Sequence, residues 1–196
     1  MKKLFIILLI ALVASGCVFA GRGIFDLTVG AAAGSTYSVN DFADWDFEHL
    51  EFSQFQFGGD VEMRLAFLSV DGKAMFAPGI QAVSGLVTAN LAVDIFFVRV
   101  KAGLGYHYQY DFANNRLSLG NVKNAKPVTE FKDLKDANFD VNVGVDVLLG
   151  NFTLGVFATL PTETSVSNGN WDSLFSSLAE NWKAAQLGLT IGYALL

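Results

Sequence analysis

Alternation of apolar and polar residues with a period of two recurs along this chain and constrains its fold more than any other feature. The clearest instance runs from Val98 to Tyr110, where the apolar phase consists of Val98, Val100, Ala102, Leu104, Tyr106, Tyr108 and Tyr110. Such alternation predicts a β-strand with one apolar face. The only long apolar run, Leu4–Val13, is too short to cross a membrane as a helix, which needs about 20 residues.

The same alternation predicts eight strands, most of them near the length that a tilted membrane strand requires. They begin near residues 25, 55, 74, 90, 98, 141, 152 and 187. Asp71-Gly72 and Gly150-Asn151 are typical of tight hairpin turns. We expect an all-β, antiparallel barrel with long links at Ser35–Gln54, Asp111–Asn138 and Pro161–Ala185. A short amphipathic helix is predicted after Asn170, from Trp171, Leu174, Phe175, Leu178 and Trp182.

The polar phase of the strands indicates which face points inward. A soluble eight-stranded cup also alternates, but its polar phase meets water and should be rich in Lys, Glu, Thr and Ser. Here that phase is rich in glycine, which suits a narrow lumen: Gly58, Gly103, Gly105, Gly144, Gly155, Gly188 and Gly192. Aromatic residues gather beside the long links, where a membrane interface would lie: Phe55, Phe57, Tyr106, Tyr108 and Tyr110. The chain is 52% hydrophobic and 16% charged, which fits a membrane barrel.

The closing stretch Gln186–Tyr193 resembles the β-signal of outer-membrane barrels. The resemblance rests on Gln186, Gly188, Ile191 and Tyr193. Many such proteins end on an aromatic residue, whereas this chain ends on Leu196. With the predicted architecture, the chain resembles the small eight-stranded outer-membrane proteins of the OmpX, OmpW and opacity-protein type. The resemblance implies the outer membrane of a diderm bacterium, with membrane lipid and the barrel-assembly machinery as partners. It implies either small-molecule passage or a structural role in the envelope.

The first 20 residues have the organisation of a signal peptide, followed by a barrel over residues 21–196. Cleavage after Ala20 and lipidation at Cys17 are both open, the latter because Ala14-Ser15-Gly16-Cys17 resembles a lipoprotein processing box. No cysteine pair exists for a disulfide. Loss of Lys2 and Lys3 would change the net charge from −6 to −8, which argues against a nucleic-acid partner.

Charged residues in the polar phase predict a network inside the barrel, made of Asp26, Glu62, Arg64, Asp94, Arg99, Lys101 and Asp146. Four acids and three bases in so narrow a space must pair, since an isolated buried charge is costly. Two interpretations are open. The network is either a structural plug or a gate that opens when Arg64, Arg99 and Lys101 change partners.

The two histidines do not indicate catalysis. His107 is expected to point inward and form lumen hydrogen bonds, but the Ser nucleophile that barrel hydrolases place beside a histidine is absent from its neighbours. His49 lies in an acidic link without metal-ligand spacing. We therefore expect no enzyme activity, cofactor or metal site.

Two functions are open. The resemblance to the OmpW type implies a narrow barrel that passes small hydrophobic solutes, and Pro78 would support this by loosening the wall of the third strand. Alternatively, the long links would bind host or envelope molecules through Phe42, Trp45, Phe47 and Phe131.

Overall fold

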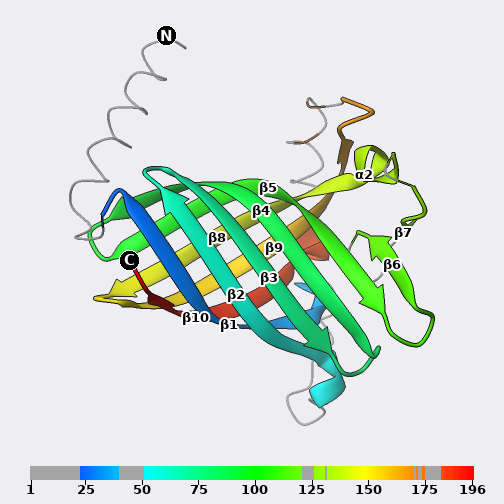
Figure 1. Ribbon diagram of the computed structural model, residues 1–196, viewed down its shortest axis with the longest axis horizontal. Helices are drawn as coiled ribbons and strands as arrows, with labels where there is room; N and C mark the ends of the chain where they lie inside the picture. The colour runs from blue at the N-terminus through cyan, green and yellow to red at the C-terminus, as the bar shows by residue number, and fades with distance from the viewer. Residues whose placement is uncertain are drawn as a thin grey trace.

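The chain forms a closed antiparallel β-barrel in a computed structural model (Figure 1). The structure describes residues 23–39, 51–120, 126–130, 132–169, 171, 174 and 182–196. Around the barrel the strands follow the order β4-β3-β2-β1-β10-β9-β8-β5, and pairing of β4 with β5 completes the ring. The eight strands expected from the alternation are therefore present, and every neighbouring pair is antiparallel.

The barrel strands are 9 to 14 residues long, as alternation over most of the chain predicts. Their bounds are β1 Phe25–Ser38, β2 Phe55–Leu65, β3 Leu68–Ala77, β4 Ala82–Ile95, β5 Val98–Asp111, β8 Asn138–Leu149, β9 Phe152–Ser165 and β10 Gln186–Ala194. Smaller elements are η3 Phe52–Gln54, β6 Arg116–Leu119, β7 Lys126–Pro127, α2 Asp133–Asp136 and η4 Trp182–Ala184.

Side-chain burial follows the alternation with the polar phase inside. In β2, Asp60, Glu62 and Arg64 are buried, while the intervening Val61 and Met63 are each 49% exposed. The same inversion holds on β5, where Arg99 is buried and Val100 is 40% exposed. The interior of this barrel is therefore polar and its outer surface is apolar.

Two-residue turns close the hairpins at one end of the barrel. They lie at Ala66–Phe67, Phe96–Phe97 and Gly150–Asn151, and the first residue of each has a positive φ, between 56° and 62°. The turn predicted at Asp71-Gly72 was wrong, because both residues lie within β3 and pair with β2. A positive φ at Ala66 is uncommon for a residue other than glycine, so the sequence carried no signal for the true turn.

The third predicted strand was also misplaced. β3 ends at Ala77, and Pro78 lies in the short turn that leads to β4. Pro78 consequently removes no hydrogen bond from the barrel wall, and its predicted role in loosening that wall was wrong.

At the opposite end, β5 changes partner. It pairs with β8 up to Gly105 and then with β6 from Tyr108 to Asp111. β6 and β7 project sideways from this point (Figure 1). Most of the helix predicted after Asn170 lies outside the described residues. The described part of the link between β9 and β10 contains the 3-10 turn η4.

No helix among the described residues is long and apolar enough to span a membrane.

Candidate functional site in the barrel interior

Arg99 lies at the centre of the charged layer inside the barrel. Its Nε donates to Asp94 Oδ1 at 2.7 Å, one terminal nitrogen donates to Asp26 Oδ2 at 2.8 Å, and the other to Glu62 Oε1 at 3.3 Å. Asp94 faces Arg99 directly across the β4–β5 ladder. Because the other two carboxylates come from β1 and β2, one guanidinium joins four strands.

Lys101, two residues after Arg99, is the next inward-facing residue of β5 and extends the network. Its Nζ lies 2.8 Å from Glu62 Oε2, 2.9 Å from Asp146 Oδ2 and 3.8 Å from Asp71 Oδ2. These carboxylates belong to β2, β8 and β3. The ammonium group thereby ties the two sides of the barrel together through its interior.

Arg64 connects the charged layer to the end of the barrel that carries the two-residue turns. Its guanidinium lies 3.4 Å from Asp94 Oδ2 and 4.0 Å from Asp26 Oδ2. It also donates to the carbonyl oxygens of Ala66 and Gly23, at 3.0 and 3.1 Å. All seven residues that the sequence placed in this network are thus buried and joined by ion pairs.

Three further charged residues of the network were missed by sequence reasoning. Lys73 on β3 pairs with Asp60 at 3.1 Å and donates a hydrogen bond to Asp71. Asp60 shares the inward phase of Glu62 and Arg64, so the alternation of β2 contained the signal for it. Asp71 and Lys73 were not predicted as members of the network because Asp71 was assigned to a turn. In total, six carboxylates of the network face four cations.

Uncharged side chains fill the lumen beyond the charged layer. Asn142 donates to Asn90 at 3.1 Å, and Asn90 donates to Thr88 at 2.9 Å. Met75, Ala32 and Phe157 form a buried apolar cluster, and Lys73 Nζ lies 4.9 Å from the centre of the Phe157 ring. The lumen in the described part of the chain is therefore packed with side chains.

His107 and Asp140 lie beyond these groups, where β8 separates from β5. Their side chains are 3% and 5% exposed, and His107 Nδ1 lies 3.7 Å from Asp140 Oδ2. The expectation that His107 forms lumen hydrogen bonds was wrong, since neither ring nitrogen has a hydrogen-bond partner among the described residues. Asp140 was not predicted. It lies 33 residues away in sequence, and only the β5–β8 register brings it near.

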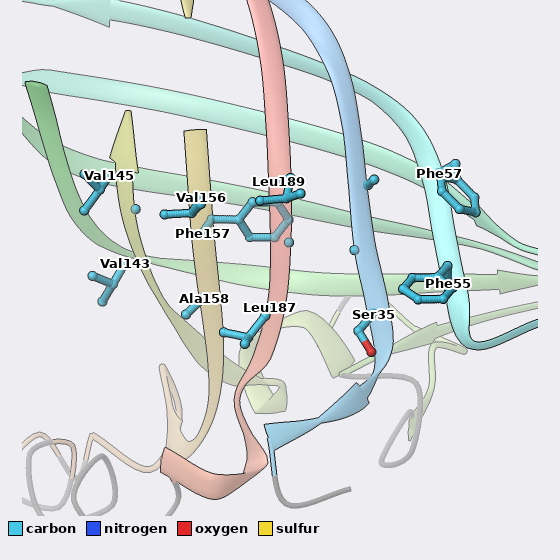
Figure 2. Close-up of a pocket in the computed structure, with 14 residues that line it drawn as sticks. Ser35, Phe55, Phe57, Val143, Val145, Val156, Phe157, Ala158, Leu187 and Leu189 are labelled. Carbon is cyan, nitrogen blue, oxygen red and sulfur yellow. The ribbon is translucent and has the colours of Figure 1, made fainter. Parts of the chain in front are cut away.

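The outer surface carries an apolar groove of about 850 Å³ over β8, β9, β10, β1 and β2 (Figure 2). Small residues such as Ala33 and Ala158 line part of it. Larger side chains of the groove lie on the exposed phase of their strands, between 38% and 59% exposed: Phe57, Val143, Val145, Val156, Leu187 and Leu189.

Aromatic side chains lie on the outer surface near both ends of the barrel. Phe57 marks the end with the long links, where its ring is stacked on that of Phe52 at 5.0 Å. At the end with two-residue turns, Phe152 and Tyr193 are in edge contact at 5.2 Å, and Phe96 and Phe97 are 72% and 62% exposed.

The residues predicted as an assembly signal lie on β10, the last strand of the barrel. β10 pairs with β1, with Gly188 opposite Gly34 and Ile191 opposite Ala31. Gln186 and Gly188 point into the lumen, while Ile191 and Tyr193 face outward. Cys17, His49 and the predicted signal peptide lie outside the described residues, as do Phe42, Trp45, Phe47 and Phe131.

No protein-family model matches the chain. No curated protein matches it in sequence either. Among solved structures it is similar to the crystal structure of Neisserial surface protein A (NspA), with 14% identity and a TM-score of 0.40. That similarity covers 88% of this chain and 96% of the other.

Proposed function

We propose that this protein is an integral β-barrel of a bacterial outer membrane, and that it acts as a structural component of the envelope whose lumen is closed by ion pairs. The observation that carries the proposal is the inverted polarity of the barrel. Arg64, Arg99 and Asp94 are at most 2% exposed, while Val61, Leu189 and Val156 are about half exposed.

A membrane is the solvent that makes this arrangement favourable. Each Å² of apolar surface removed from water contributes about 25 cal/mol, so leaving the outer rows of Val, Leu, Ile and Phe in water would be strongly unfavourable. Closure of the ring by β4 and β5 also gives every strand a partner on both sides, as hydrocarbon requires. The apolar groove and the aromatic residues near both ends fit lipid and its two interfaces.

Closure of the lumen follows from the ion pairs. Arg99 and Lys101 together bind carboxylates from five other strands, so opening a path would require several buried charges to separate at once. A buried charge that is left without its partner costs roughly 3–5 kcal/mol. This supports the plug over the gate.

Planar-bilayer recording tests the closed lumen, with Arg99→Gln and Lys101→Gln combined as the informative variant. We expect the native barrel to give no steady conductance. The variant should unfold at a lower temperature, and a current that appears only in the variant would agree with closure by these ion pairs. A steady current in the native protein would contradict the plug and support a gate.

We further propose that the end of β10 serves as the assembly signal. In support, this strand pairs with β1, so its recognition would hold the chain until the barrel can close. Tyr193→Ala should lower the amount of heat-modifiable barrel recovered from outer membranes, while refolding of the purified chain in detergent should be unaffected. Equal loss in both settings would indicate a defect of stability instead.

A further inference from the structure

His107 and Asp140 form a pair of buried polar groups that the ion-pair network does not include. His107 follows Gly105, the last residue of β5 that pairs with β8, and Gly105 lies opposite Asp140. Both side chains project into the lumen and are buried, with 3% and 5% of their surface exposed. Gln109 lies two residues further along β5, on the same inward phase.

Polar atoms of these three residues have no hydrogen-bond partner among the described residues. They are both ring nitrogens of His107, Asp140 Oδ2 and Gln109 Oε1. Apart from one imidazole N–H, every one of these atoms offers a lone pair. When the His107 imidazole is neutral, such a set leaves the buried carboxylate of Asp140 without a cation, which is costly. A cation bound between them would remove that cost.

The distance between His107 Nδ1 and Asp140 Oδ2 limits which ligand could bridge these two atoms. At 3.7 Å it is too long for a direct hydrogen bond, which spans about 2.7–3.2 Å. A water molecule that donates or accepts at about 2.8 Å on each side would hold the two atoms about 4.5 Å apart. Two ligands at about 2.0–2.2 Å from one zinc ion lie at most about 4.2 Å apart, and about 3.4 Å apart at the tetrahedral angle.

We propose that His107 and Asp140, with Gln109 as a third ligand, bind one divalent transition-metal ion of the zinc class inside the barrel. Imidazole nitrogen and carboxylate oxygen are ligands that zinc accepts together. No group of three His, Cys, Asp or Glu side chains in the described part of the chain is placed to hold a metal. The site therefore depends on an amide oxygen and on water to complete the coordination.

The ion would also join the barrel wall at its weakest point. Beyond Gly105, β5 and β8 share no ladder hydrogen bonds, and β5 pairs with β6 instead. A metal bonded to His107 on β5 and Asp140 on β8 would bridge the strands where they separate. This role does not depend on whether the barrel conducts or on which membrane holds it.

Calorimetric titration of the refolded, detergent-solubilised protein with Zn²⁺ tests the site. We expect one ion per chain and a higher unfolding temperature when zinc is present, because binding to the native state alone stabilises it. Since even outer-shell partners of a metal are worth about 10–100-fold in affinity, His107→Gln and Asp140→Asn should each weaken binding by at least about tenfold. The chain offers a matched control in His49→Gln, which removes the only other histidine and should leave binding unchanged.

Cu²⁺ as a second probe reports the ligand type directly. Its electron paramagnetic resonance spectrum should show splitting from a single nitrogen, which His107→Gln removes and His49→Gln retains. Absence of stoichiometric Zn²⁺ binding would overturn the proposal. Binding that survives His107→Gln but disappears with His49→Gln would overturn it as well, because the ion would then belong to the acidic link. Should His107→Gln fail to fold, Asp140→Asn and the His49→Gln control still decide between these outcomes.

Discussion

Arg99 makes three ion pairs in the barrel interior, as many as Lys101, with partners on β1, β2 and β4. Its side chain is fully buried. Removing its charge would leave Asp26, Glu62 and Asp94 with fewer cations in a space that water does not reach. The stability of the barrel should therefore respond strongly to this one side chain.

We predict that Arg99→Gln lowers the free energy of unfolding by roughly 3–5 kcal/mol, as expected when one partner of a buried pair is lost. Urea unfolding of the refolded barrel, followed by the mobility difference between unheated and boiled samples on gels, measures the change. Arg116→Gln is the matched control, since Arg116 is exposed on β6 and its loss should change stability little. Equal effects of the two substitutions would contradict the account of the network.

Asp133 organises the link that leads to β8. Its Oδ2 accepts hydrogen bonds from the backbone N–H groups of Thr129 and Glu130, at 2.7 and 2.9 Å, and from the Thr129 hydroxyl at 3.0 Å. These bonds favour the charged carboxylate, the backbone ones most, and they hold the pKa of Asp133 below its ordinary value of 3.8.

Because the pKa is lowered in the folded state, the contribution of Asp133 to local order is complete above about pH 4 and is lost as the pH falls through the lowered value. We predict that the amides of Thr129 and Glu130 exchange slowly with solvent at pH 5 and faster in Asp133→Asn at the same pH. Hydrogen-exchange mass spectrometry of this segment checks the prediction. Identical exchange in the two proteins would show that the carboxylate does not order the link.

At the scale of the strands, two adjacent glycines on β2 differ in the space that a side chain would have. A Cβ atom on Gly58 would lie 1.8 Å from the carbonyl oxygen of Ala74 on β3, whereas the nearest atom to a Cβ on Gly59 is 3.8 Å away. Gly58 therefore marks a close approach of two strands, which curves the wall of a narrow barrel. Gly59 faces outward and has room.

We predict that Gly58→Ala destabilises the barrel by about 1–3 kcal/mol or more, because the backbone of β2 or β3 must shift. Gly59→Ala should be tolerated. The fraction of heat-modifiable, folded protein after refolding of each variant measures the difference. Equal tolerance of alanine at both positions would contradict the close approach.

Strand alternation predicted the barrel elements well where the outward phase is strongly apolar. The ranges expected for β2, β5 and β10 agree with the structure within a few residues. β3 and β4 were the exceptions, since they begin at Leu68 and Ala82 and not near residues 74 and 90. The turn before β3, at Ala66–Phe67, carries no glycine, while Asp71-Gly72 within β3 has the composition of a turn. Local composition therefore failed where the long-range pairing of β3 with β2 and β4 determines the structure.

For the interior, the sequence could predict only which side chains of each strand point inward, because alternation within a strand shows this and no more. Arg99 and Asp94 follow from alternation on neighbouring strands, and their inward direction was evident. The approach of Asp140 to His107 depends on which residue of β8 lies opposite Gly105, and the separation of the strands beyond it depends on β6. Neither follows from single-strand patterns, so a metal site at this point was beyond sequence reasoning.

For the molecule as a whole, the structure separates its surfaces by polarity. Charged side chains are buried in the interior, while rows of apolar side chains cover the outside between aromatic residues near both ends. The low overall content of charge and the absence of a second long apolar run after Leu4–Val13 have one explanation. Apolar residues occupy every second position of eight strands, which together form one continuous apolar surface.

The central claim is that this outer surface lies in lipid, and spin labels on it test that claim most directly. In a Cys17→Ser background, nitroxides are attached at Val156→Cys and Leu189→Cys on the apolar groove, and at Asn114→Cys in an exposed turn as the control. In vesicles, the first two labels should collide more with oxygen, which concentrates in hydrocarbon, than with a water-soluble nickel chelate. The control label should show the reverse. If the labels at 156 and 189 favour the nickel chelate as the control does, the outer surface faces water and the account is wrong.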